Sequence, residues 1–265
     1  MVVIESKGIS DVGRKRKNNE DAMFLDDAIN LYVVADGMGG HQAGEVASGI
    51  VVETIRDYMI QSKGVEPAGE NEYTDQSISM GANRLVSGIR LANRGVYGLS
   101  KQNEAYEGMG STVSAVLFTD DTLIAANVGD SPVYLIHRDK IELISVLHTV
   151  LAEQMAIDPD RARNIEPRFA HLLTRAVGID ETVRPDVCET PCFKGDVLVI
   201  SSDGLSNKVT PEEILEIAGN KPPRKACAAL VDLANERGGD DNITVIVLKV
   251  KDKINKMGWF ARLMS

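Results

Sequence analysis

The stretch Asp36-Gly37-Met38-Gly39-Gly40-His41 joins an apolar run, Leu31 to Ala35, to a long pattern of helical spacing. The apolar run predicts a buried strand, and three glycines within four positions predict a sharp turn with little side-chain cover. An aspartate at a strand end, followed by an uncovered peptide carbonyl, offers two hard oxygen ligands of the kind that Mg²⁺ or Mn²⁺ prefers. The alternative is a tight turn whose aspartate caps the next helix. The stretch alone does not decide between these interpretations.

Composition narrows the class of protein. The 265-residue chain contains 43% hydrophobic and 26% charged residues, which is ordinary for a globular protein. Its formal net charge of −10 argues against nucleic acid as the main partner, because binding a phosphate backbone requires a positive face. The three cysteines lack Cys-x-x-Cys spacing, so we expect neither a disulfide framework nor a zinc site, and we expect a reducing compartment.

Neither a secretion signal nor a membrane span is expected. The first seven residues lack the charged and apolar regions of a signal peptide, and no apolar run is long enough to cross a bilayer. The expected location is the cytoplasm.

Hydrophobic spacing predicts the order of the elements. We expect strands at residues 2–11, 22–26, 31–35, 186–190, 196–200 and 243–250. We expect helices at 42–60, from about 78 to 99, from Thr210 onward and at 222–236, with a polar linker at 62–74. Short β-rich runs between residues 112 and 145 predict an antiparallel meander. The irregular segment from 146 to 172 is of a kind that often forms a mobile element near a site.

Aspartates recur at the ends of these strands. Asp203 follows a strand and precedes a glycine, as Asp36 does, and Asp241 comes just before the last strand. If the three strands lie side by side, the carboxylates converge at one edge and need two divalent cations to offset their charge. Since the chain has 39 acidic residues, chance placement is the competing interpretation.

Two further charged features have an ordinary and a functional interpretation. The run from Arg14 to Asp21 contains four cations followed by two carboxylates, and such runs usually form a solvated loop. The functional interpretation is an arginine that grips a phosphate beside carboxylates that order metal-bound water. Asp130 lies in a predicted turn, where aspartate is common.

Eight short motifs follow one another along the chain: Ser10-Asp11-Val12-Gly13, Arg16 with Asn18-Asn19-Glu20-Asp21, Asp36-Gly37-Met38-Gly39-Gly40-His41, Gly110-Ser111-Thr112, Asn127-Val128-Gly129-Asp130-Ser131, Leu173-Thr174-Arg175-Ala176-Val177-Gly178, Ser202-Asp203-Gly204-Leu205 and Asp241-Asn242-Ile243-Thr244. From residue 10 to about 250 the chain thereby resembles the metal-dependent protein serine/threonine phosphatases of type 2C, in their compact bacterial form. The resemblance implies an α+β fold, a four-layer α/β/β/α sandwich of two mainly antiparallel sheets flanked by helices. It implies a phosphatase domain at 1–250, with a flap at about 146–172, and a C-terminal tail at 251–265, which we expect to be a docked helix. The alternative for the tail is a docking site for a partner or a membrane surface.

The resemblance also assigns roles to site residues. Asp36 would bridge two Mg²⁺ or Mn²⁺ ions, whose other ligands would be the Gly37 carbonyl, Asp203 and Asp241. Asp130 would help to bind a third, weaker ion. Glu20 and Asp21 would hold metal-bound waters, and Arg16 would bind the phosphate. Met38 stands where some family members carry a histidine, the candidate acid for the leaving group.

The implied reaction is hydrolysis of phosphoserine or phosphothreonine in proteins by a water that bridges the two metals. The implied partners are phosphorylated protein substrates and a serine/threonine kinase or its targets, and we expect a monomer. Three alternatives stay open: a catalytically weak phosphoprotein-binding regulatory module, a phosphatase dedicated to one regulatory phosphoprotein, and a two-metal phosphodiesterase or nuclease. The net charge of −10 argues against the last of these.

Overall fold

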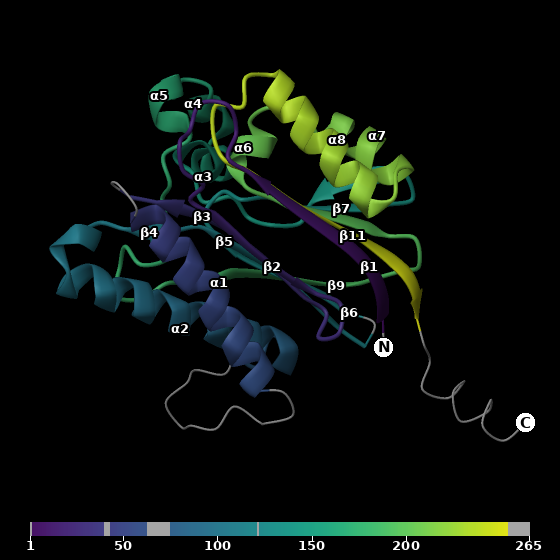
Figure 1. Cartoon of the computed structure of the whole chain (residues 1–265), viewed down its shortest axis with the longest axis horizontal. Coiled ribbons are helices and arrows are strands. Elements are labelled where there is room, and N and C mark those ends of the chain that lie inside the picture. Colours follow the sequence, from purple (N-terminus) through teal and green to yellow (C-terminus); the bar gives the residue numbers. More distant parts are fainter. Residues whose placement is uncertain (1, 40–42, 63–74, 121, 254–265) are drawn as a thin grey trace, which may run out of the picture.

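The computed structural model describes residues 2–39, 43–62, 75–120 and 122–253. Two antiparallel β-sheets lie face to face, and helices cover the outer face of each sheet (Figure 1). The predicted four-layer α/β/β/α sandwich is therefore confirmed.

The first sheet contains the two ends of the described chain. Its strand order is β1-β11-β10-β7-β8, formed by β1 (Val2–Asp11), β11 (Ile243–Lys253), β10 (Val197–Ser201), β7 (Val133–His137) and β8 (Lys140–Leu143). Strands β1 and β11 pair along their whole length, with Asp11 opposite Ile243. The loop that follows β1 is thereby placed beside the residues that precede β11.

The second sheet carries the glycine-rich turn. Its strand order is β2-β3-β5-β6-β9, formed by β2 (Asp21–Asp26), β3 (Leu31–Met38), β5 (Val113–Thr119), β6 (Thr122–Val128) and β9 (Asp186–Pro191), and β4 (Gly110–Ser111) pairs with the end of β3. In the β2–β3 pairing, Asp21 lies opposite Asp36.

The helices divide between the two outer faces. Helices α1 (Ala43–Gln61) and α2 (Met80–Gln102) cover the second sheet, and α7 (Pro211–Asn220) and α8 (Pro223–Glu236) cover the first (Figure 1). The short helices α3 (Val150–Ile157), α4 (Pro159–Ala162), α5 (Pro167–Ala170) and α6 (Asp203–Ser206) gather at one end, and a 3₁₀ turn, η1 (Glu104–Tyr106), follows α2.

Three apolar layers hold the four structural layers together. Strand β3 shows why, because its side chains alternate between the two faces of the sheet. Leu31 and Val33 pack against α1 and α2, whereas Tyr32 and Val34 pack between the sheets. A third cluster, which includes Val199 and Val247, lies between the first sheet and α7–α8.

The predicted meander between residues 112 and 145 is wrong in one respect. Strands β5 and β6 pair in the second sheet, but β7 and β8 pair in the first, so the chain crosses between the sheets at residues 129–132. The sequence pattern could not reveal this crossing because β5, β6 and β7 are buried on both faces and lack an inward–outward alternation.

Most other elements were predicted to within a few residues. Helix α7 begins with the predicted N-cap Thr210, whose side chain accepts from the Glu213 amide while the Glu213 carboxylate accepts from the Thr210 amide. Strand β11 runs to Lys253, so it includes the first three residues of the segment predicted as a tail. Residues 254–265, with the predicted docked helix, lie outside the described residues, as do most of the linker and Gly40 and His41.

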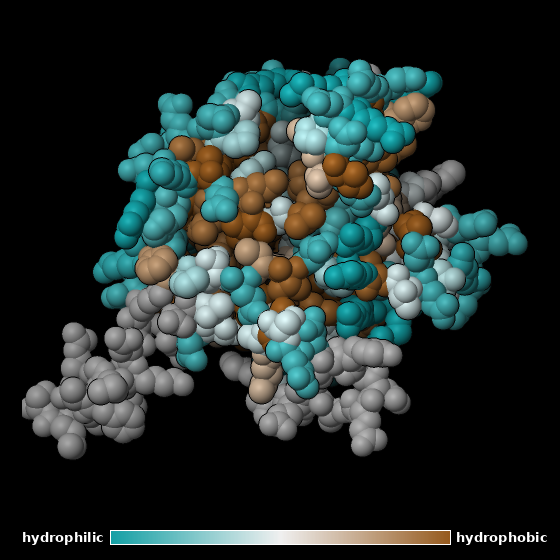
Figure 2. All heavy atoms as spheres, turned by 180° about the vertical axis from the view of Figure 1, so that it is seen from behind, coloured by the Kyte–Doolittle hydropathy of each residue, from teal (hydrophilic) through white to brown (hydrophobic). Residues whose placement is uncertain are grey.

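The surface is mixed in character. On the face opposite to that of Figure 1, apolar residues gather over the centre between hydrophilic regions (Figure 2). Within the described residues, no helix is both long enough and apolar enough to span a membrane.

Candidate active site

The predicted site residues meet at one end of the sandwich, around a pocket of about 270 Å³. The pocket is lined by Arg16, Glu20, Asp36, Gly37, Met38, Gly39, Thr112, Asp130, His171, Leu173, Asp203, Asp241 and Asn242. This lining contains seven of the eight residues that the sequence pointed to, and the eighth, Asp21, lies opposite Asp36 on the neighbouring strand. The convergence of strand-end carboxylates was therefore not a matter of chance placement.

Hydrogen bonds between the sheets bring the acidic residues together. The Ser202 hydroxyl, at the end of β10, donates to Asp21 Oδ2 at 2.7 Å, and the Thr244 amide of β11 donates to the same hydroxyl at 2.9 Å. Asp21 belongs to the second sheet and the other two residues to the first. The bonds thus hold Asp36, through its partner strand, close to the start of α6, where Asp203 lies.

Asn242 holds the charged loop that follows β1. Its side-chain amide donates to the carbonyls of Val12 and Asn18, and its side-chain oxygen accepts from the amide of Glu20 at 2.8 Å. The loop is thus anchored at three points and is not a freely solvated run. Sequence reasoning gave Asn242 no role of its own, since this role depends on contacts with residues more than 200 positions away.

The glycine-rich turn allows α1 to approach the site closely. A Cβ on Gly37 would lie 2.0 Å from the carbonyl oxygen of Gly44, and a Cβ on Gly44 would lie 2.4 Å from Glu20 Oε2. Helix α1 begins at Ala43, seven residues after Asp36. Asp36 is therefore not the cap of this helix, because a cap residue immediately precedes the first helical turn.

The buried carboxyl groups perturb one another. Burial is the main cause that raises the pKa of Asp36 well above its usual range, and the neighbouring carboxylates of Asp21, Asp203 and Asp130 raise it further. Burial likewise raises the pKa of Asp130 to about 7, with Asp203 adding to the shift. The pKa of Asp203 is also raised, mainly by burial and by Asp241, although a hydrogen bond with Asp36 opposes the shift. The raised pKa values show that these carboxyl groups repel one another when charged, and bound cations would relieve this repulsion.

Comparison with known proteins identifies the family. The sequence profile described as "Protein phosphatase 2C" matches residues 13–240. The chain belongs to the protein phosphatase 2C family. The fold, the pocket and the family agree, and the prediction of a bacterial-type protein phosphatase, a hydrolase, is confirmed.

Several relatives match the phosphatase over almost its whole length. The serine/threonine phosphatase stp of Listeria innocua is 32% identical over 247 residues, which are 91% of this chain and 93% of that protein. The protein phosphatase PhpP of Streptococcus pneumoniae is 28% identical over 255 residues, which are 92% of this chain and 97% of that protein.

Solved structures agree with this assignment. The serine/threonine phosphatase PstP/Ppp of Mycobacterium tuberculosis has a TM-score of 0.79 at 30% identity, and the match covers 95% of this chain and all of that one. A structure of the PstP catalytic domain in complex with two manganese ions has a TM-score of 0.79 at 32% identity, with the same coverage.

The donor atoms of the phosphatase suit hard divalent cations. Asp36, Asp203 and Asp241 offer carboxylates and Gly37 offers a carbonyl, whereas no cysteine lines the pocket. Oxygen donors without thiolates favour Mg²⁺ or Mn²⁺ over Zn²⁺. Among the described residues, no three Asp, Glu, His or Cys side chains already stand in ligating positions. Instead the carboxylates have protein partners, for example Asn207, whose amide donates to Asp203 Oδ2 at 3.1 Å.

Arg16 is directed into the pocket as predicted, although it pairs with a carboxylate there. Its Nη2 donates to Asp241 Oδ2 at 2.8 Å, and about half of its side chain (52%) is exposed. Glu20 lies close enough to interact electrostatically with Arg16, although burial is the larger effect and raises the pKa of Glu20. Arg14 does not line the pocket, so Arg16, to which the resemblance assigns the phosphate, is the arginine of this loop that does.

The segment predicted as a flap contributes His171, just after α5, and Leu173 follows directly beyond its predicted end. His171 lines the same pocket as Met38, which resembles in position a histidine of some family members. Burial is the main cause that raises the pKa of Asp203, and His171 is close enough to Asp203 to oppose this shift. Sequence reasoning missed His171, because a histidine in an irregular segment carries no spacing signal.

Proposed function

We propose that this phosphatase hydrolyses phosphoserine and phosphothreonine in proteins, with two Mg²⁺ or Mn²⁺ ions held by Asp36, Gly37, Asp203 and Asp241. The observation that carries the proposal is the pocket itself, in which buried carboxyl groups with raised pKa values surround a space beside an arginine. The serine/threonine phosphatases among the relatives and the manganese in the PstP structure support the same function.

Each acidic residue of the pocket would have its own role in the reaction. Divalent cations bound in this pocket would offset the carboxylate charge and supply an activated water for attack on phosphorus. Asp36 lies opposite Asp21 and is close enough to interact electrostatically with Asp203, Asp130 and Asp241, so we assign it the role of a ligand shared by both ions. Glu20 and Asp21 border the same cluster, where they would accept hydrogen bonds from ordered waters. Asp130 would help to hold a third, weaker ion.

Arg16 would bind the phosphate of the substrate. To do so it exchanges Asp241 for the phosphate oxygens. The present ion pair is half exposed, and exposed pairs contribute only about 0–1 kcal/mol. Breaking this pair therefore costs little, and the planar guanidinium can form two parallel, charge-assisted bonds with the oxygens of a phosphate. Removing Arg16 would therefore weaken phosphate binding more than it slows the chemical step.

The substrate is a phosphorylated protein, and we propose a serine/threonine kinase or its targets as partners, with the enzyme acting as a monomer in the cytoplasm. The low cysteine content and the absence of paired cysteine spacing support a reducing compartment. A catalytically weak binding module and a phosphatase dedicated to one phosphoprotein share this site, and they differ from the proposal in turnover on a simple peptide.

The test is phosphate release from a phosphothreonine peptide with Mn²⁺, with Mn²⁺ plus excess chelator, and with the Asp203→Asn variant. We expect release with Mn²⁺ and a loss of at least about a hundredfold in both other cases, since even residues that only support metal ligands cost 10–100-fold. Asp232→Asn is the matched control, because it makes the same change on the exposed face of α8. Full release with chelator, or an Asp203→Asn variant as active as the wild type, would contradict the proposal.

A further inference from the structure

A second pocket, with a volume of about 800 Å³, lies between α2 and the segment that leads from α5 to β9. The charged residues in its lining are Arg90, Arg94, Arg175, Arg184, Asp180 and Glu181. We call it the arginine pocket. Among the lining residues four arginines face two acids, so guanidinium groups outnumber carboxylates there. Its volume is in the range of ligand sites and accommodates several residues of an extended peptide.

Buried contacts fix the shape of the arginine pocket. Asn93 on α2 is only 1% exposed, and its side-chain amide donates to the carbonyls of Asp180 and Glu181, both at 3.1 Å. Its side-chain oxygen accepts from the amide of Gly178 at 2.7 Å. Gly178 has a φ of +88°, and a Cβ there would lie 2.2 Å from Val96 Cγ1, so only glycine allows the loop to rest on α2 in this way.

The arginines come from both walls of the pocket. Arg90 and Arg94 lie one turn apart on α2, on the same face as Tyr97. Arg175, on the facing loop, is held in place because its Nη1 donates to Asp186 at 2.6 Å and to the Arg184 carbonyl at 2.8 Å. Neither Arg90 nor Arg184 forms an ion pair with another residue of the described ranges, so both keep donors for a ligand.

The pKa of Asp75 indicates that Arg90 and Arg184, from the two walls of the arginine pocket, lie near each other. The Ser77 hydroxyl is the main cause that lowers the pKa of the Asp75 carboxyl, and Arg184 and Arg90 lower it further. Both guanidinium groups therefore lie near one exposed carboxylate. Asp75 is an internal competitor for any anion that enters the pocket.

The arginine pocket is rigidly connected to the active site. Leu173 lines the active-site pocket and Ala176 lines the arginine pocket. Three residue steps separate them, or at most about 11 Å along the chain. The next residue, Val177, exchanges two backbone hydrogen bonds with Ser111, at 3.0 and 2.8 Å, and the Ser111 hydroxyl donates to the Asp36 carbonyl at 3.0 Å.

We propose that the arginine pocket binds an acidic segment of the phosphoprotein substrate, a few residues away from the phosphorylated residue. This inference rests on the proposed function of the active site. An extended peptide advances about 3.3 Å per residue, so a substrate chain that leaves the active site reaches the arginine pocket within about three to six residues. Carboxylates are the anions that guanidinium groups recognise best in a peptide without further phosphates.

The first arm of the test compares kcat/KM for two phosphothreonine peptides at low ionic strength. One carries four glutamates at positions three to six from the phosphothreonine and the other carries glutamines there, with separate pairs for the two sides. We expect the wild type to favour the glutamate peptide about tenfold on one side, and the Arg90→Gln/Arg184→Gln variant to show no preference. The glutamine peptide should be hydrolysed equally by both proteins.

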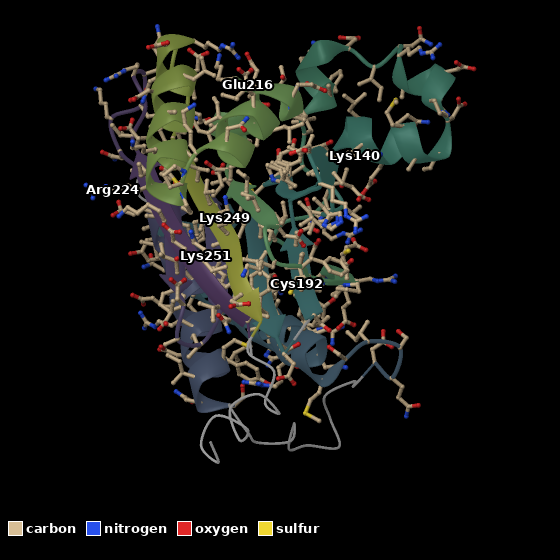
Figure 3. All side chains as sticks on the ribbon, turned by 90° about the vertical axis from the view of Figure 1, so that its right-hand side faces the viewer. Lys140, Cys192, Glu216, Arg224, Lys249 and Lys251 are labelled. Atoms are coloured by element: carbon tan, nitrogen blue, oxygen red, sulfur yellow. The ribbon has the colours of Figure 1, made fainter. Side chains whose placement is uncertain are left out.

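Two further variants are measured in this comparison of kcat/KM, one as a control and one that should increase the preference. Arg224→Gln removes one positive charge from α8, on which Arg224 projects outward from the opposite helical layer (Figure 3), and should keep the tenfold preference. Asp75→Asn removes the internal competitor but keeps an oxygen that can accept from Ser77, and should increase the preference about two- to threefold. A preference that survives in the Arg90→Gln/Arg184→Gln variant would overturn the inference.

The second arm measures binding without catalysis. The anisotropy of a fluorescent glutamate peptide that carries unmodified threonine is recorded in the presence of chelator. We expect the Arg90→Gln/Arg184→Gln variant to bind about tenfold more weakly than the wild type and Arg224→Gln to bind equally well. Binding of this peptide without turnover of the phosphopeptides would refute the proposed function, and with it the role of the pocket in substrate choice, but would leave the arginine pocket as a site for acidic peptides. Turnover without any discrimination in either arm, or displacement of the peptide by ATP at much lower concentration, would refute the inference and leave the function standing.

Discussion

The carboxyl of Asp130 should make the metal-free protein less stable as the pH rises. Burial raises its pKa from about 4 in the unfolded chain to about 7 in the folded protein. Between these values the folded state binds more protons than the unfolded state, so the free energy of unfolding falls with rising pH. A shift of about three units corresponds to about 4 kcal/mol at most, and partial access to water reduces this to about 2–4 kcal/mol. Asp130→Asn removes this cost because the amide does not ionise.

The assay is urea unfolding followed by circular dichroism at pH 4.5, 6 and 8 in the presence of chelator, with a separate series in Mn²⁺ at pH 8. We expect Asp130→Asn to be more stable than the wild type by about 2–4 kcal/mol at pH 8 and nearly equal to it at pH 4.5. Asp139→Asn, which changes the charge equally at an exposed turn, should show no such pH-dependent gain. With excess Mn²⁺ at pH 8 the wild type should gain more stability than the variant. A gain that is the same at pH 4.5 and pH 8 would refute the reasoning, because it would then not come from ionisation.

Three further substitutions test how the site is built. Asn242→Ala removes three hydrogen bonds that anchor the loop after β1. Urea unfolding should show a free energy of unfolding lower by about 2–4 kcal/mol, and phosphate release should show reduced phosphatase activity. Gly44→Ala places a methyl group against the Glu20 carboxylate and 3.0 Å from the backbone carbonyl carbon of Gly37. We expect kcat/KM to fall about tenfold and the free energy of unfolding to fall by about 1–3 kcal/mol. Thr210→Ala removes the N-cap of α7 and should cost about 1 kcal/mol of stability with unchanged kcat/KM; a loss of activity there would show that α7 is coupled to the site.

Much of the fold could be predicted because its signals are local. The apolar runs that became β3, β10 and β11 are continuous, as expected of strands buried on both faces. The start of α7 carries a complete capping box, which needs only four consecutive residues. The same burial on both faces explains the error in the meander, since no alternation tells which sheet a strand joins.

The acidic cluster could be predicted because each of its members stands at the end or start of a strand. The pairing of β10 with β11 brings Asp203 and Asp241 together. Asp36 lies on a strand of the other sheet and joins them through its neighbour Asp21, which accepts from Ser202 across the two sheets. The competing interpretation of chance placement was removed by the pocket, and the helix-cap interpretation by the start of α1 at Ala43.

Other parts of the site depend on contacts that no local pattern encodes. Asn242 acts through bonds to residues near the opposite end of the chain, and His171 enters the pocket from an irregular segment. The arginine pocket combines a helix and a loop that lie about 90 residues apart in the sequence, joined by the side chain of Asn93. Such sites become visible only when the tertiary structure is known.

The most direct test of the central claim is a manganese titration in which bound metal and phosphate release are measured in the same samples. The carboxylate cluster predicts two ions bound tightly per chain, a third bound more weakly, and activity that appears only as the second tight site fills. Asp36→Asn should lose tight binding of both ions together with activity, because Asp36 is placed to serve both. Full activity with one bound ion or none, or two tight ions retained by an inactive Asp36→Asn variant, would contradict the account.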